Sequence, residues 1–376
     1  MLLRTFGWSM GITVAGLAAA AYFWGADGFG VVLILSVLEI SLSFDNAVIN
    51  ATILKRMTPF WQRIFLTVGV LIAVFGMRLV FPLLVVALTA HIGPQTVVSL
   101  ALDSSKTSGG LTYAQHLDAA HPAIAAFGGM FLLMIFLDFI LGEKEVRWLG
   151  WIEGPLERIG KLNQLSVVVS MIVLMLSARF FAEDRAETVL LAGVAGLTSY
   201  LAVSGLSELF ESAGEEDEDE DSEAASGSAS GEGAGEGAVA AAASGSGKSA
   251  LLVAGKAAFF LFLYLEVLDA SFSFDGVVGA FAISQDIFQI TLGLGIGALY
   301  IRSLTVYLVR QGTLDDYIYL EHGAHYAIGA LAIILMVSIK YSIPEVVTGL
   351  IGVAFIGLAL LSSVARNRRV AAEGTG

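Results

Sequence analysis

Long apolar runs, each close to the length of a bilayer-spanning helix, recur along most of this chain of 376 residues. A helix needs about 20 consecutive apolar residues to cross the hydrocarbon core of a bilayer. The pattern therefore predicts an all-α polytopic membrane protein with about ten transmembrane helices. The expected spans lie at residues 7–25, 29–54, 61–90, 121–141, 164–181, 187–210, 250–284, 286–310, 322–341 and 345–365.

The composition agrees with a chain that lies mostly in lipid. Hydrophobic residues make up 56% of the sequence and charged residues 14%, and the mean hydropathy is +0.80, whereas soluble domains carry about 25% charged residues. We therefore expect a multi-pass protein of the cell membrane whose partner is the lipid bilayer. The absence of cysteine excludes disulfides, thiolate metal sites and cysteine nucleophiles.

The formal charge of −14 comes mainly from one segment. Residues 208–236 contain twelve acids and no base, so the rest of the chain is close to neutral and offers no basic surface for a nucleic acid. Residues 211–249 are acidic, rich in glycine, serine and alanine, and lack aromatic residues, which is typical of disorder. We expect a cytoplasmic linker between a first membrane half, residues 1–210, and a second half, residues 250–376. The alternative is a buffer or sensor of divalent cations.

Basic residues set the expected orientation. With ten spans, fourteen lysines and arginines fall on the side of both termini and four on the other side. The positive-inside rule then places both termini in the cytoplasm. Arg78 and Arg302 fall within spans. Each either extends to the membrane interface or supplies counter-charge inside the protein.

A seven-residue acidic pattern occurs twice. Residues 39–45 are EISLSFD and residues 269–275 are DASFSFD. The first copy lies in the second span and the other in the seventh, so an odd number of spans separates them and the two helices run in opposite directions. The sequence therefore predicts two inverted-topology repeats, with cores at about residues 29–141 and 250–341. Such repeats place their binding site at the bilayer midplane.

Further matching residues follow the motif in the same order in both halves of the sequence. Arg78 matches Arg302, and AHPAIAA at residues 120–126 matches AHYAIGA at residues 324–330. His121 and His325, which lie in this last pair, fit either proton relays or packing at the start of their helices.

The acids of the motifs lie within predicted membrane spans, where a charged side chain is energetically unfavourable. A charged residue at mid-membrane costs roughly 2.5–3.5 kcal/mol on insertion scales. The serines between the acids compete for backbone hydrogen bonds and favour local distortion. We expect both motif helices to be broken at mid-depth, so that the carboxylates converge on an ion site.

The expected ligands are hard oxygen donors. The predicted metal ligands are Glu39, Asp45, Asn46, Asp269 and Asp275, the supporting oxygens are those of Ser41, Ser43, Ser271 and Ser273, and the counter-charges are Arg78 and Arg302. Oxygen-rich sites suit magnesium, calcium and manganese, and manganese or calcium fits better because magnesium gives up its waters reluctantly. The alternative for the acids is structural ion pairing with the two arginines.

Charge balance suggests a mechanism. Four ionised carboxylates and one divalent ion leave a net charge of −2, and clustered acids take up protons when the ion departs. This predicts a secondary transporter that exchanges a metal cation for protons or sodium, with no catalytic residues and no resident cofactor. The alternatives are a membrane scaffold for metal or tellurite stress response and an intramembrane aspartyl protease using Asp45 and Asp275.

LEISLSFDNAV at residues 38–48, with its second copy, resembles the TerC-like integral membrane proteins of the LysE transporter superfamily, and is most similar to an uncharacterised branch. The resemblance implies efflux of manganese or a related metal, with a link to tellurite resistance. It also implies that Glu39, Asp45, Asn46, Asp269 and Asp275 line the ion path. The second copy departs from the pattern because Gly276 stands where the first has Asn46, so one ligand is missing.

Overall fold

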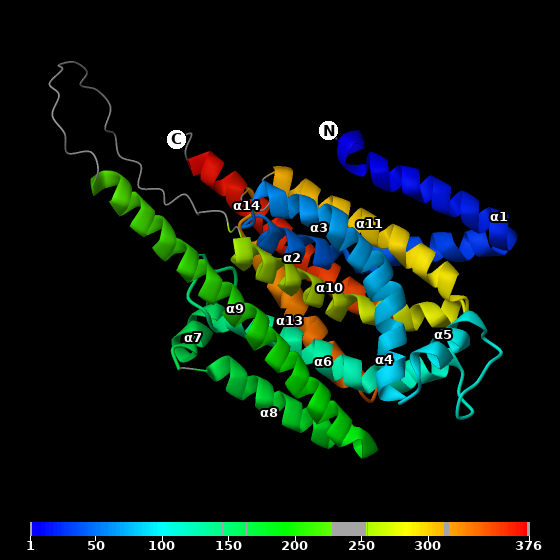
Figure 1. Cartoon of the computed structure of the whole chain (residues 1–376). Coiled ribbons are helices and arrows are strands. Elements are labelled where there is room, and N and C mark those ends of the chain that lie inside the picture. The colour runs from blue at the N-terminus through cyan, green and yellow to red at the C-terminus, as the bar shows by residue number, and fades with distance from the viewer. Residues whose placement is uncertain are drawn as a thin grey trace, which may run out of the picture.

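The computed structural model describes residues 2–144, 146–162, 164–227, 253, 255–311 and 316–373. Within these ranges the fold is all-helical and contains no strand, as Figure 1 shows. Its helices are α1 (Leu2–Leu42), α2 (Phe44–Leu54), α3 (Pro59–Leu71), a π-helix (Ile72–Val80), α4 (Phe81–Thr89), α5 (Pro94–Leu102), α6 (Tyr113–Leu141), α7 (Gly150–Gly160), α8 (Leu165–Phe180), a 3-10 turn (Glu183–Arg185), α9 (Ala186–Gly227), α10 (Gly255–Ile283), α11 (Ile287–Gln311), α13 (Leu320–Ser338) and α14 (Glu345–Glu373).

The expected class of polytopic all-α membrane protein is confirmed. Seven helices of the described residues are long and apolar enough to cross a membrane, and the bent pair α7–α8 is an eighth candidate. The sequence predicted about ten spans. One cause of the lower number is α1, a single element that contains the first expected span and the start of the second.

The two parts of α1 are separated by a sharp turn at Gly25. Its φ of 70° and ψ of −159° are not helical, and glycine adopts a positive φ without the steric cost of a Cβ atom. Ser9 contacts Ser303 on α11, with 2.7 Å between the hydroxyl oxygens, whereas Ser36 donates to the carbonyl of Gly293 near the other end of α11. The chain thus turns back at Gly25 and packs both parts of α1 against one helix (Figure 1).

Only one of the two motif helices is broken, which corrects the expectation for the second. α1 ends at Leu42 and α2 begins at Phe44, because Ser43 has φ −101° and ψ 18°. In the second motif α10 continues as a regular helix through the equivalent position. Ser41 and Ser271, which occupy equivalent positions, each donate to the carbonyl four residues earlier on their own helix, at 2.7 and 2.9 Å, so these bonds do not distinguish the broken motif from the unbroken one.

The span around Pro82 is distorted upstream of the proline. Pro82 lies in the first turn of α4, directly after the π-helix Ile72–Val80. A proline cannot donate to the carbonyl four residues earlier, and the wider π turn before it accommodates this loss. The π-helix carries Arg78, one of the two arginines within the spans, and π turns occur frequently at functional sites.

The main apolar core lies where α6 packs against α9 and α13. The helix α9 continues to Gly227, and so extends into the acidic segment that the sequence predicted to be a linker. Residues 228–252 lie outside the described residues. The linker boundaries at 211 and 249 therefore stay a prediction.

Close packing between α1 and α11 gives a test of the fold. A Cβ atom added to Gly293 would lie 2.6 Å from the Leu35 Cβ and 3.1 Å from the Val32 carbonyl oxygen, whereas one added to Gly357 meets nothing within 4 Å. We expect Gly293→Ala to lower the free energy of unfolding by about 1–3 kcal/mol, the usual cost of overpacking. The measurement is thermal unfolding in detergent with Gly357→Ala as the control. Equal melting of the two variants would contradict this packing.

Candidate functional site

The first acid of each motif forms an ion pair with the arginine of its own half. Arg78 donates to Glu39, and Arg302 Nη2 lies 3.4 Å from Asp269 Oδ2. All four side chains are buried, with no residue more than 5% exposed. Neither arginine therefore extends to the surface, and both act as counter-charges to motif acids in this structure.

Glu266 belongs to this centre, although it is not among the metal ligands predicted from the sequence, where a place at the rim of the site and a structural role were both open. Both of its carboxylate oxygens accept from Arg302, at 3.1 Å from Nη1 and 3.0 Å from Nη2. The guanidinium also lies over the Phe65 ring, 4.2 Å from its centroid, and so makes a cation–π contact. The signal in the sequence was spacing, since Glu266 precedes Asp269 by three residues and thus shares a face of the helix with it.

The two motif helices meet through a reciprocal pair of contacts. Asn46 Nδ2 donates to Asp269 Oδ1 at 2.7 Å. Gly276, which occupies the same motif position as Asn46, lies against Glu39, because a Cβ atom added there would be 3.4 Å from the Glu39 Oε2 atom. In each motif, the residue that follows the last aspartate lies against the first acid of the other motif. A two-fold arrangement of the motifs requires this reciprocity.

A second reciprocal pair lies one turn away. Ser36 and Glu266 each precede the first motif acid by three residues, and Gly69 and Gly293 each precede the arginine of their half by nine. Ser36 donates to the Gly293 carbonyl at 3.0 Å, while a Cβ atom on Gly69 would lie 2.7 Å from Glu266 Oε1. The same positions meet in both crossings, which is the geometry expected of an inverted repeat.

The serines of the motifs do not all face the centre. Ser41 is exposed and donates to the Val37 carbonyl, because two residues after Glu39 a helix has turned by about 200°. Its expected role as a supporting oxygen is therefore not seen. Ser43 lines a cavity, Ser271 bonds within α10, and the buried hydroxyl of Ser273 has no hydrogen-bond partner among the residues that the structure describes.

The expected cage of four carboxylates is described only in part. The side chains of Asp45 and Asp275 lie outside the described residues, although their backbone lies in α2 and α10. Within the described part of the chain, no group of three histidine or acidic side chains is placed to hold a metal ion. What the structure brings together is Glu39, Asn46 and Asp269, with two arginines on the carboxylates.

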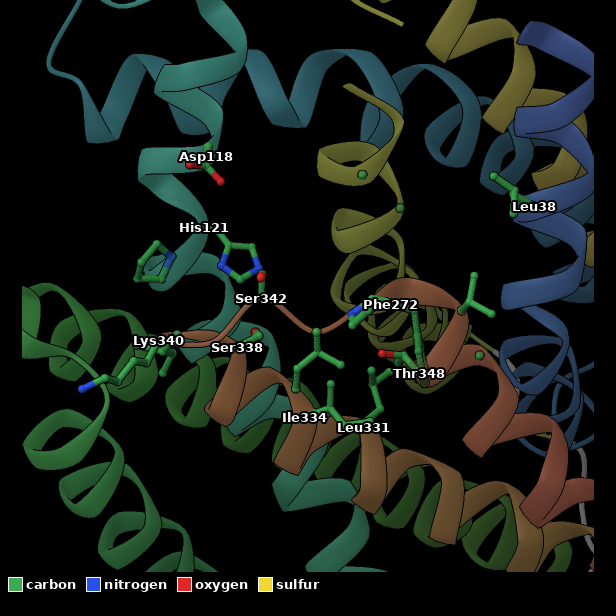
Figure 2. Close-up of a pocket in the computed structure, with 18 of the residues that line it drawn as sticks. Leu38, Asp118, His121, Phe272, Leu331, Ile334, Ser338, Lys340, Ser342 and Thr348 are labelled. Carbon is green, nitrogen blue, oxygen red and sulfur yellow. The ribbon is translucent and has the colours of Figure 1, made fainter. Parts of the chain in front are cut away.

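A cavity of about 630 Å³ reaches this centre. Its lining includes Glu39 and Ser43 from the first motif and Gly276 from the second. Figure 2 shows Asp118 and His121 projecting from α6 into the same opening. Lys340 also lines it, and a hydrogen bond to Glu183 raises the pKa of this lysine, so its positive charge is balanced by a neighbouring carboxylate.

A smaller cavity of about 260 Å³ lies at the opposite ends of the same helices. It is lined by Ile135 of α6 and by Glu321 and His325 of α13. On α6, Asp118 of the larger cavity and Ile135 of the smaller one are about 26 Å apart along the axis. The two cavities therefore lie toward opposite ends of these helices, and the lining of the larger one includes motif residues.

The buried pairing of Arg302 yields a prediction about stability. Arg302→Met leaves Glu266 and Asp269 buried without their counter-charge, which we expect to lower the free energy of unfolding by about 3–5 kcal/mol. The matched control is Arg310→Met, since Arg310 is exposed on the same helix. Thermal unfolding in detergent measures both, and a melting temperature of Arg302→Met no lower than that of the control would contradict the pairing.

Comparison with known proteins places the chain in a family without naming an activity. No curated protein and no solved structure matches it. The family described as "Protein of unknown function (DUF475)" matches residues 44–370, a range that includes both acidic motifs except for the start of the first. The chain therefore belongs to the DUF475 family.

Proposed function

We propose that the protein is a secondary transporter that exports a divalent metal cation, manganese above all, in exchange for protons or sodium. The observation that carries the proposal is the reciprocal meeting of the two acidic helices beside a cavity. Asn46 contacts Asp269 and Gly276 contacts Glu39 in the buried centre, and the larger cavity reaches Glu39. Inverted-repeat transporters bind their ions at such a crossing.

The charge of the centre favours a cation. The two motifs and Glu266 carry five acids, whereas the buried bases paired with these acids in the described residues are Arg78 and Arg302. Excess negative charge in an apolar environment is unfavourable and is relieved by a bound cation or by protons. A divalent ion compensates most of the formal excess of three charges, and protons or sodium take its place when it leaves.

The donor chemistry narrows the cation to hard metals. Carboxylate, amide and hydroxyl oxygens suit manganese and calcium, and the chain has no thiolate to attract softer ions. Asp45 and Asp275 are the proposed primary ligands, with Glu39, Asn46 and Asp269 beside them. The resemblance to TerC-like proteins supports manganese and the outward direction of transport.

The two cavities fit alternating access. With both termini in the cytoplasm, as the positive-inside rule favours, the larger cavity opens to the outside and the smaller one to the cytoplasm. The exported ion would then load from the smaller cavity and leave through the larger one. The structure then represents an outward-open state, because the larger cavity, which opens to the outside where the ion is released, is the one that reaches Glu39.

Metal flux tests the transport proposal. We expect Asp45→Asn and Asp275→Asn each to lower manganese uptake into everted vesicles roughly tenfold or more, because each removes a charged oxygen ligand. Asp103→Asn, in an exposed loop, is the control and is expected to leave the flux unchanged. Wild-type flux in both motif variants would reject the transporter and favour the scaffold.

The sidedness is tested separately, and the absence of native cysteine makes this direct. A cysteine replacing Ser342, which lines the larger cavity, should react with a membrane-impermeant maleimide added to intact cells. A cysteine replacing the exposed Phe60, at the other end of the spans, should react only after permeabilisation. The reverse pattern would place the larger cavity in the cytoplasm and exclude export through it.

A further inference from the structure

Each cavity is lined by a carboxylate and an imidazole from one turn of a helix. Asp118 and His121 of α6 line the larger cavity, and Glu321 and His325 of α13 line the smaller one. The two histidines occupy the same position in the matching segments AHPAIAA and AHYAIGA. The repeat matches the two histidines, while each carboxylate comes from a different position of its own helix, three residues before His121 and four before His325.

We propose that these two pairs are transit sites for the divalent cation, one on each side of the central motifs. That the cation passes through these sites rests on the proposed function. That each pair binds a cation does not depend on it. Residues three or four positions apart on a helix lie on one face, with Cβ atoms about 5–6 Å apart. A carboxylate and an imidazole in this arrangement can both reach one metal ion.

The hydrogen bonding of His325 leaves a nitrogen suited to a metal. The Glu321 backbone carbonyl, 2.8 Å from His325 Nδ1, is an acceptor only, so Nδ1 carries the hydrogen and donates it. In the neutral ring Nε2 then keeps its lone pair. Metal-binding histidines are commonly held in this way, with the other ring nitrogen donating to a backbone carbonyl.

Packing fixes the plane of the same ring. His325 stacks on Phe139 with 3.8 Å between ring centroids and 9° between the planes. The ammonium of Lys144 lies 4.8 Å from the centroid of Phe139. The imidazole is therefore oriented before any ion arrives, which reduces the entropy lost on binding.

The small number of ligands suits transit rather than storage. Within the described residues no third histidine or acid joins either pair, so water supplies the remaining coordination. An ion on a transport path must bind well enough to be captured and weakly enough to leave. The imidazole also disfavours magnesium and calcium, because nitrogen ligands suit transition metals better than these two ions.

The bases near the pairs have partners of their own. Lys340 is paired with Glu183, 2.9 Å away. Arg185 donates to the Ala119 carbonyl at 3.2 Å. Arg56 and Glu321 both line the smaller cavity. These interactions limit the repulsion that a cation meets in either cavity.

The test uses manganese binding to the purified full chain in detergent, followed by electron paramagnetic resonance. The variants are Asp118→Asn with His121→Gln, and Glu321→Gln with His325→Gln. We expect each double variant to lose a share of the bound manganese and of the nitrogen coupling that imidazole gives to the manganese signal. The matched control is Asp103→Asn with His91→Gln, which alters an acid and a histidine in the loops around α5.

The outcomes separate this inference from the transporter proposal. Loss of nitrogen coupling in the cavity variants, but not in the control, supports the transit sites even if Asp45→Asn and Asp275→Asn leave the flux unchanged. Unaltered manganese binding and coupling in both cavity variants, with unchanged thermal unfolding, overturns the transit sites even if those motif variants abolish transport. Equal losses in the control also overturn them, because the coupling would then come from surface histidines.

Discussion

The fold depends on ion pairs that neutralise acidic side chains buried among apolar helices. Glu39, Glu266 and Asp269 are buried, and each accepts from Arg78 or Arg302. Removing one partner of a buried ion pair lowers the free energy of unfolding by about 3–5 kcal/mol, because the other charge stays buried without a partner. The arginines therefore constrain which helices must touch. Arg302 links α11 to α10, and Arg78 links the π-helix to α1. The same pairs leave the centre with more acids than bases, which is why a cation is the ligand we propose.

Glycine makes this close approach of charged helices feasible. Gly69 leaves space for the Arg302–Glu266 pair, and Gly297 and Gly293 allow α11 to lie against α1 at Glu39 and Leu35. A side chain at Gly69 would clash with the Arg302–Glu266 pair, and one at Gly293 or Gly297 would clash with α1. Because Gly69 and Gly293 occupy equivalent places in the two halves, the inverted repeat extends to the packing as well as to the charges.

Much of the architecture could be predicted from the chain. Hydrophobic length and the paired motifs EISLSFD and DASFSFD indicated an all-α membrane protein and two oppositely directed halves, and the described helices agree with that class. The break expected at both motifs occurs only at Ser43. The counterpart of Ser43 in the second motif is Ser273, which lies within the unbroken helix α10, so the serines of the motif do not by themselves decide where a helix breaks. Ser41 was assigned from its position in the motif, but helical rotation turns it away from Glu39.

The sequence by itself determined where apolar helices form and in what order the charged motifs follow, because both depend on local composition and spacing. It could not decide the partners of the charges. Arg302 donates to Glu266 from both of its terminal nitrogens, and Asn46 donates to Asp269 of the other repeat. These contacts depend on distances between segments that are more than 30 and more than 220 residues apart in the sequence. Only the packing of whole helices sets such distances, and so only the tertiary structure decided which acids are neutralised by arginine and where the larger cavity reaches Glu39.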